Sequence, residues 1–220
     1  MNLPLLPWLC PPYRVAFSTR VGGVSQGPYS SLNLGSRVGD LPHAVAENRA
    51  RLAKAFGYVP AKVKGLPIPS GDLLVSRQVG EGLLLTLADC LPIAIVRLDG
   101  PSALAVVHAG WQGLLSDVVS AAASALGPGR KMAVIGPSIG PCCYSIKEDV
   151  AGPYRTRFGR SVVRSGHLNL RAAAVQALAE IGCVSVEHFD ICTRCHPEMF
   201  FSHRRDGVPC GRQGIIGVIE

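Results

Sequence analysis

Three polar residues, Asp89, Cys90 and His108, lie within the most apolar part of the sequence. Asp89 and Cys90 follow one predicted strand, and His108 ends another, just before the turn-forming segment 110–113. Burying a carboxylate and an imidazole among Leu, Ile and Val costs several kcal/mol unless each group finds a partner. The pattern therefore has two interpretations. Either these residues form a reactive site at the ends of two strands, or Cys90 is a small core residue and His108 is a core histidine whose ring nitrogens are hydrogen-bonded.

Cys90 and His108 could carry two kinds of chemistry. A thiolate and a neutral imidazole are both good zinc ligands, and a catalytic zinc is held by three protein ligands with a fourth position open. Alternatively, His108 could deprotonate Cys90 and produce a nucleophile without a metal. The residue types leave both chemistries open.

A second group of cysteines is less informative. Segment 192–196 reads Cys-Thr-Arg-Cys-His, which is the pattern of haem attachment. That attachment takes place outside the cytosol, and the N-terminal segment lacks the features of a signal peptide. As a zinc knuckle, Cys192 and Cys195 lack a second pair at standard spacing, because Cys142 and Cys143 are adjacent. We therefore expect a loop with partly buried thiols.

An anion site is the third possibility. Segment 17–23, Phe-Ser-Thr-Arg-Val-Gly-Gly, ends a predicted strand. Its glycines let the backbone approach a ligand, and its hydroxyls together with Arg20 suit phosphate. Arg204, Arg205 and Arg212 add cationic side chains further along the chain. The alternative is an ordinary turn and a solvated surface.

The elements that must position these residues intermix along the chain without strict alternation. We expect strands at 13–18, 73–76, 83–87, 93–98, 103–108, 131–135, 184–189 and 214–219, and helices at 40–56, 114–126, 148–158 and 171–181. This order predicts an α+β fold with a mixed sheet or two packed sheets. A length of 220 residues favours a single domain spanning 1–220.

Composition argues against two classes of partner. The net charge is +7, but the basic residues are scattered and only 6% of residues are aromatic, so we do not expect nucleic-acid binding. The apolar stretch 83–96 is interrupted by Asp89 and Pro92 and is too short to span a bilayer comfortably. We expect a cytoplasmic protein with reduced cysteines, a small-molecule substrate and no membrane partner. The sequence leaves the oligomeric state open.

Seven segments carry a family resemblance. They read Phe-Ser-Thr-Arg-Val-Gly-Gly-Val-Ser-Gln-Gly-Pro-Tyr (17–29), Ser-Leu-Asn-Leu-Gly (31–35), Glu-Asn-Arg (47–49), Ala-Asp-Cys-Leu-Pro (88–92), Val-His-Ala-Gly-Trp-Gln-Gly (107–113), Ile-Gly-Pro-Ser-Ile-Gly-Pro-Cys-Cys-Tyr (135–144) and Phe-Phe-Ser-His-Arg-Arg-Asp (200–206). In these segments, over nearly the whole chain, the protein resembles the YfiH or laccase-domain family.

The resemblance implies a fold and an activity. Members of that family have mixed β-sheets sandwiched between helices, a fold similar to that of the necrotizing-factor deamidase toxins. They are described as purine nucleoside phosphorylases with adenosine deaminase and methylthioadenosine phosphorylase activities on one zinc site, and an amidase role has been attached to some. Copper oxidase chemistry is not expected, because the sequence has no multiple His-x-His pairs.

The resemblance also implies ligands for zinc. Cys90 and His108 match the family's Cys and one His, whereas the third ligand, a His in a Gln-Val-His-Gly motif, corresponds to Lys64 in Lys-Val-Lys-Gly (62–65). A lysine is protonated near neutrality and ligates a metal only if its pKa is strongly depressed. Loss of one of three ligands weakens metal binding.

Three hypotheses follow from this departure. In the first, the chain keeps phosphorolysis of adenosine- or inosine-type nucleosides, with Arg20, Asn33 and Arg204 binding substrate or phosphate; His196 or His203 would then complete the zinc site. In the second, Cys90, His108 and Lys64 form a metal-free hydrolase or amidase. In the third, the chain is a degenerate paralogue that binds a ligand without turnover.

Overall fold

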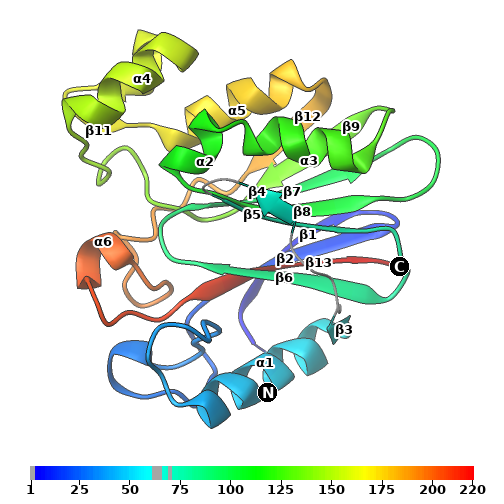
Figure 1. The fold of residues 1–220 in the computed structure, drawn as a ribbon. Helices are drawn as coiled ribbons and strands as arrows, with labels where there is room; N and C mark the ends of the chain where they lie inside the picture. Colours follow the sequence, from blue (N-terminus) through cyan, green and yellow to red (C-terminus); the bar gives the residue numbers. More distant parts are fainter. Residues whose placement is uncertain (1–2, 61–65, 69–70) are drawn as a thin grey trace.

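Two β-sheets pack face to face in this protein, whose computed structural model describes residues 3–60, 66–68 and 71–220 (Figure 1). The strands are β1 (Leu5–Cys10), β2 (Tyr13–Ser18), β3 (Val59–Pro60), β4 (Leu66–Ile68), β5 (Gly71–Ser76), β6 (Glu81–Leu87), β7 (Leu91–Arg97), β8 (Leu104–Ala109), β9 (Lys131–Ile135), β10 (Val163–Arg164), β11 (His167–Leu168), β12 (Cys183–His188) and β13 (Gln213–Ile219). One sheet has the order β1-β2-β13-β6-β3 and the other the order β12-β9-β7-β8-β5-β4, while β10 and β11 form a separate pair. Both large sheets contain parallel and antiparallel pairs.

Helices cover the outer faces of both sheets. The helices in the described residues are α1 (Pro42–Phe56), α2 (Trp111–Leu115), α3 (Val118–Leu126), α4 (Glu148–Phe158), α5 (Leu170–Glu180) and α6 (His203–Asp206), with short 3-10 turns at Gly27–Tyr29 and Arg160–Val162. In Figure 1, α1 lies below the five-stranded sheet, and α2, α3 and α5 lie above the six-stranded sheet. The fold is therefore α+β, with mixed sheets sandwiched between helices, and the prediction of its class is confirmed.

The apolar strands β7 and β8 separate two cores. Val96 and Val106 face the five-stranded sheet in one buried cluster, whereas Ile95 and Val107 face the helices in another. Alternate side chains of a strand point to opposite faces, so a central strand covered on both sides is apolar throughout. The same alternation places His108 on the face of Val106, between the sheets.

The helix predicted over 114–126 is interrupted, and this expectation was wrong. Asp117 adopts a left-handed conformation with φ 54°, which ends α2 and begins α3. The helix predicted over 148–158 is confirmed as α4, and Pro153 lies inside it. At α1, Leu41 occupies the N-cap, and the Asp40 carboxylate accepts hydrogen bonds from Ser25 and Asn33.

Gly23, within the predicted anion segment, is required by close backbone contact. A Cβ built on Gly23 would lie 2.5 Å from the Cα of Leu32 and still closer to the carbonyl oxygen of Ser31. Gly23→Ala should therefore lower the free energy of unfolding by about 2–3 kcal/mol. The matched control is Gly152→Ala in α4, which has ordinary space and should raise stability slightly. Urea unfolding of both variants checks the prediction, and equal stabilities would contradict it.

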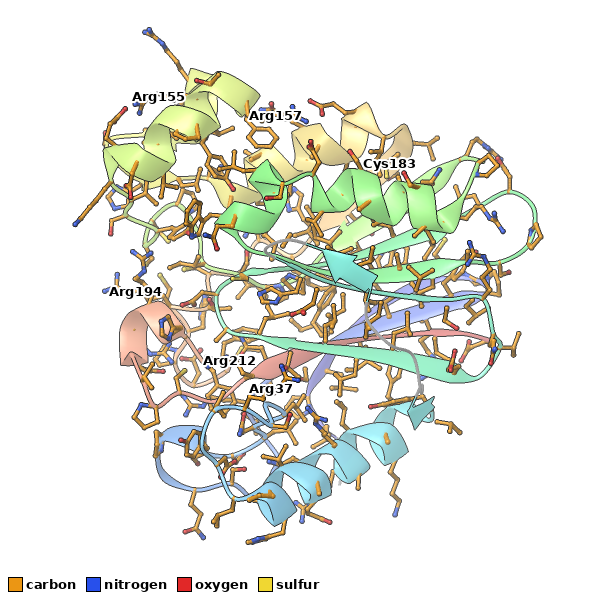
Figure 2. All side chains as sticks on the ribbon, in the orientation of Figure 1. Arg37, Arg155, Arg157, Cys183, Arg194 and Arg212 are labelled. Atoms are coloured by element: carbon orange, nitrogen blue, oxygen red, sulfur yellow. The ribbon has the colours of Figure 1, made fainter. Side chains whose placement is uncertain are left out.

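No helix in the part of the chain that the structure describes is long and apolar enough to cross a membrane. Figure 2 shows the labelled cationic side chains in separate places, with Arg155 and Arg157 by α4 and Arg194 by α6. Two of these are paired: Arg157 bonds Glu180 and Arg155 bonds Glu148.

Candidate functional site

The segment 88–90 carries the chain from β6 in one sheet to β7 in the other, and Cys90 ends it. The antiparallel register of β7 and β8 pairs Leu91 with Ala109 and Pro92 with His108. Cys90 consequently lies beside Gly110, and a Cβ built on Gly110 would be 3.3 Å from the Cys90 Sγ. Cys90 and His108 thus lie at the same end of two neighbouring strands.

His108 is oriented by a carboxylate that the sequence analysis did not identify. Asp72 lies opposite His108 in the β5–β8 pair, and its Oδ2 is 3.1 Å from His108 Nδ1. An ionised carboxylate only accepts hydrogen bonds, so Nδ1 carries the hydrogen and Nε2 of the neutral ring has its lone pair free. A free Nε2 can ligate a metal or accept a proton.

Asp89 is the buried carboxylate at the site, and its contacts are structural. Its Oδ1 accepts from the Thr193 hydroxyl at 2.7 Å, and its Oδ2 accepts from the Arg204 backbone N–H at 2.6 Å. Its own carbonyl accepts from Ile139 N at 2.9 Å. With φ 79°, Asp89 is also one of the non-glycine residues in the left-handed region. Asp89 therefore holds the loops that follow β9 and β12 against Cys90.

A cavity of about 240 Å³ opens beside Cys90. Its walls include Trp111, Tyr144, His203 and Arg204. All of these except His203 also line an adjoining cavity of about 440 Å³. Pockets for small ligands are mostly apolar with a few placed polar groups, and these walls combine two aromatic rings with a guanidinium.

Arg204 is positioned to meet an anion in this cavity. Its guanidinium stacks over the Tyr144 ring at 4.9 Å, and Nη1 donates to the carbonyl oxygen of Ser145 at 2.8 Å. Among the residues that the structure describes, Nε and Nη2 of Arg204 have no hydrogen-bond partner. Those two donors are free for a ligand.

Burial governs the charge state of the thiol. Desolvation raises the pKa of Cys90 to about 11, and the negative charge of Asp89 acts in the same direction. Burial likewise raises the pKa of Tyr144 to about 12. Without a bound cation, Cys90 is a neutral thiol near neutral pH.

Arg20 and Asn33 do not line the Cys90 cavity. Arg20 donates to the carbonyl oxygens of Ser30 and Pro197, and it stacks on the Phe201 ring at 4.5 Å. Asn33 is fully buried, and its side-chain Oδ1 accepts from the backbone N–H of Arg212 at 2.8 Å. The structure thus gives both residues loop-holding contacts, and their part in phosphate binding stays a prediction.

The remaining predicted site residues lie in different places. His203 lines the cavity beside Cys90, whereas His196 lies elsewhere, with Nδ1 3.3 Å from a carboxylate oxygen of Glu198. Lys64 lies outside the residues that the structure describes. Within residues 3–60, 66–68 and 71–220, Cys90 and His108 are not part of any group of three or more potential metal ligands gathered within 4.8 Å.

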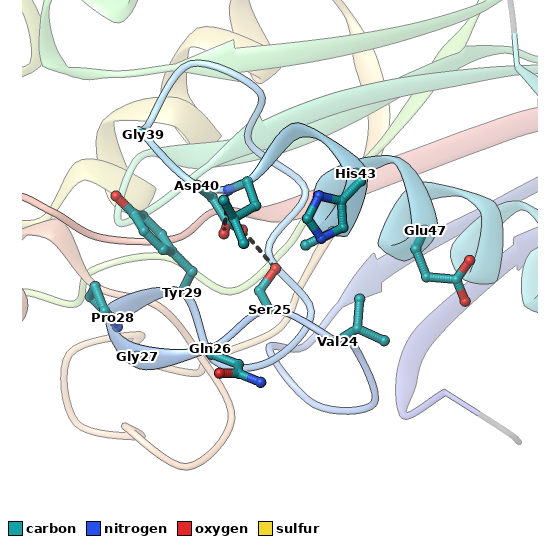
Figure 3. Close-up of a pocket in the computed structure, with 12 residues that line it drawn as sticks. Val24, Ser25, Gln26, Gly27, Pro28, Tyr29, Gly39, Asp40, His43 and Glu47 are labelled. Atoms are coloured by element: carbon teal, nitrogen blue, oxygen red, sulfur yellow. Dashed lines mark hydrogen bonds between the residues drawn. The ribbon is translucent and has the colours of Figure 1, made fainter.

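A third cavity, of about 560 Å³, lies between the loop 24–29 and the start of α1 (Figure 3). Ser25 donates to the Asp40 carboxylate at 2.6 Å at its edge, and the buried Asn48 amide donates to Ser25 Oγ at 2.9 Å. The family-like segments 17–29, 31–35 and 47–49 thus meet in one hydrogen-bond network. No residue of this cavity lines the one beside Cys90.

Comparison with known proteins agrees with these motifs. A family model described as multi-copper polyphenol oxidoreductase laccase matches residues 14–220. A protein of Deinococcus radiodurans named purine nucleoside phosphorylase is 37% identical, over 99% of this chain and 94% of its own length. The Escherichia coli purine nucleoside phosphorylase YfiH is 34% identical, over 86% of this chain and 87% of its own length.

Solved structures show the same likeness. The crystal structure of a Neisseria meningitidis protein superposes with a TM-score of 0.88 at 30% identity, covering all of both chains. Bacillus licheniformis YfiH follows with a TM-score of 0.84 at 26% identity, covering 94% of this chain and 93% of that one. With its motifs, its fold and these relatives in agreement, the chain belongs to the YfiH, or polyphenol oxidoreductase laccase, family.

Proposed function

We propose that this protein is a purine nucleoside phosphorylase acting on adenosine- or inosine-type nucleosides in the cytoplasm. The observation that carries the proposal is a cavity lined by Cys90, Trp111, Tyr144 and Arg204, at the end of β7 that lies next to His108 of β8. The names of the relatives support the reaction class.

In this reaction a phosphate oxygen attacks C1′ of the ribose, the glycosidic C–N bond breaks, and the purine leaves with the bonding electron pair and takes up a proton. Trp111 and Tyr144 offer aromatic surface to the flat purine. Arg204 offers Nε and Nη2 to phosphate, and paired N–H donors match the geometry of a phosphate group.

Zinc fits the pair of side chains at the end of β7 and β8. The test is the Asp72–His108 contact, because an imidazole fixed through Nδ1 presents Nε2, and imidazole and thiolate sulfur are donors that zinc prefers. Cys90 and His108 would hold the ion. We propose His203, which lines the cavity beside Cys90, as the third ligand, and its side chain would have to move closer to bind, because the three residues are not gathered within 4.8 Å of one another. When bound, zinc supplies positive charge that stabilises developing negative charge.

The decisive experiment combines an inosine-plus-phosphate assay with elemental analysis of protein purified without a metal-affinity tag. Phosphate-dependent release of hypoxanthine supports phosphorolysis, and adenosine as substrate reports both adenine release and deamination to inosine. Absence of both products would overturn the proposal. Iodoacetamide-sensitive hydrolysis by zinc-free protein would instead identify a Cys90 hydrolase.

Asp72→Asn should lower zinc affinity and kcat/KM by about 10- to 100-fold, because the residue orients a ligand without touching substrate. The amide can present its NH₂ group to Nδ1 and favour the wrong tautomer of His108. Titration with a zinc chelator and steady-state kinetics measure the two losses. Asp99→Asn, at an exposed Asp99–Arg130 pair, is the matched control and should leave both quantities unchanged.

A further inference from the structure

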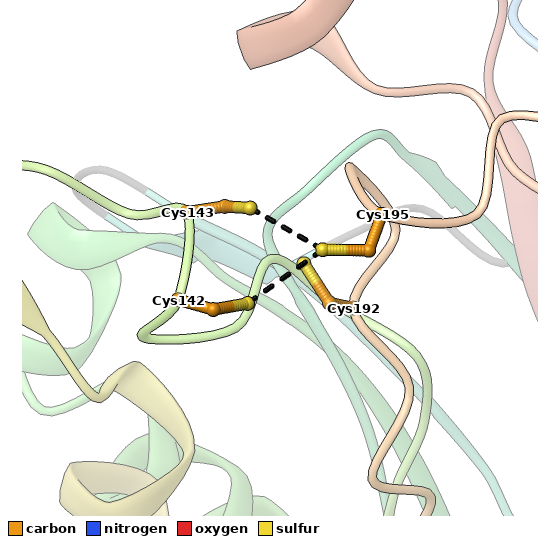
Figure 4. A group of neighbouring side chains, drawn as sticks. All are labelled: Cys142, Cys143, Cys192 and Cys195. Carbon is orange, nitrogen blue, oxygen red and sulfur yellow. Dashed lines mark hydrogen bonds between the residues drawn. The ribbon is translucent and has the colours of Figure 1, made fainter.

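Four cysteines that lie far apart in the sequence meet at one end of the six-stranded sheet (Figure 4). Cys142 and Cys143 follow β9, and Cys192 and Cys195 follow β12. Because β9 and β12 are parallel neighbours, the loops that follow them leave the sheet at the same end. The isolated bridge between Ser138 and Cys192 continues this pairing into the loops.

The spacing of the sulfur atoms fits one tetrahedral ion. All four Sγ atoms lie within 4.8 Å of one another, with 3.7 Å between Cys142 and Cys195 and 3.4 Å between Cys143 and Cys195. A zinc ion with Zn–S bonds of about 2.3 Å places its ligands about 3.8 Å apart. A disulfide needs a sulfur–sulfur bond of about 2.0 Å, which is far shorter than these separations.

The backbone prepares the site for thiolates. The Gly140 N–H donates to the Cys192 Sγ at 3.2 Å, and the Cys195 N–H donates to the carbonyl oxygen of Cys192 in a tight turn. A Cβ on Gly140 would lie 3.2 Å from the Cys142 Sγ and 3.3 Å from the Cys192 Cβ. The absence of a side chain at Gly140 therefore leaves the cysteines room to converge.

The ligand set selects the metal. Four thiolates are soft donors that suit zinc or iron and exclude magnesium and calcium, which prefer oxygen. The compact group of sulfurs leaves space for a single ion and none for the bridging sulfides of an iron–sulfur cluster. A four-cysteine zinc site has no open position and is structural.

We propose that Cys142, Cys143, Cys192 and Cys195 bind a structural zinc ion, at a site distinct from Cys90 and His108. The ion would join two loops that wall the Cys90 cavity, because Tyr144 follows Cys143 directly and Thr193 follows Cys192 and donates to Asp89. The proposal does not depend on the nucleoside reaction.

The test distinguishes zinc bound by the four cysteines from zinc bound by Cys90 and His108. Purified His108→Ala protein should keep one zinc per chain, and Cys195→Ser in the same background should lose it. Cobalt loaded into His108→Ala protein should give the charge-transfer absorption of tetrahedral cobalt thiolate, which Cys195→Ser abolishes. Cys10→Ser is the control, because Cys10 lies at the end of β1 and contacts Met132.

X-ray absorption at the zinc edge of His108→Ala protein needs no cysteine variant that could misfold. It should show four sulfur neighbours at about 2.3 Å. Zinc-free His108→Ala protein, nitrogen or oxygen ligands in place of sulfur, or a disulfide among these cysteines would each overturn the proposal. Absence of phosphorolysis in the unaltered protein, with retention of this zinc, would refute the proposed function alone.

Discussion

His108→Ala should lower kcat/KM for inosine phosphorolysis by about 10³-fold or more. The change removes the imidazole that Asp72 holds in place beside Cys90. Cys90→Ser should have a similar effect, because a hydroxyl replaces the soft sulfur donor. Steady-state kinetics with inosine and phosphate, together with zinc content, measure both variants.

The matched controls are His43→Ala, at an exposed position at the start of α1, and Cys10→Ser in β1. Both should retain the activity and zinc content of the unaltered protein. Retention of full activity by His108→Ala would place the chemistry elsewhere and refute the site.

Asp89→Ala should cost about 3–5 kcal/mol of stability. The substitution leaves the Thr193 hydroxyl and the Arg204 N–H without their buried acceptor. It also places alanine at φ 79°, where a Cβ is strained. Chemical denaturation measures the loss, and activity should fall with it because the cavity wall is released.

Two companion variants separate these causes. Asp89→Asn keeps one acceptor oxygen and a side chain that tolerates the left-handed region, so it should lose the least stability. Asp89→Gly removes the acceptor but relieves the backbone, so it should be more stable than Asp89→Ala by about 1–2 kcal/mol. Equal stabilities for all three variants and the unaltered protein would show that the Asp89 side chain does not stabilise the fold.

Much of the fold follows from the sequence because its strands are continuous apolar runs. The strands around 83–87, 93–98 and 103–108 were identified from composition, and their ends fixed Cys90 and His108 at one place. The break at Asp117 was missed because Ala-rich spacing continues across it and only backbone conformation reveals it. The short strand β4 and the single-turn helix α6 are too brief to carry a periodic signal.

The rest of the site depends on pairing across strands. Asp72 was not singled out because a lone carboxylate at the start of a strand acquires meaning only through its register with His108. Segment 192–196 was expected to be a loop with partly buried thiols, and Cys192 and Cys195 do lie in such a loop. The sequence did not show that Cys142 and Cys143 lie close to them, because this depends on β9 and β12 being neighbours.

The position of β13 has a consequence for how the protein is made. β13 lies between β2 and β6, where Ile215 pairs with both Phe17 and Leu85. During synthesis, β2 and β6 have no strand between them until residue 219 has left the ribosome. Such distant pairing is slow to form and leaves apolar strand edges open meanwhile. The five-stranded sheet of the nascent chain therefore stays incomplete until β13 has been made, and ribosome stalling before residue 213 would leave a chain prone to aggregation.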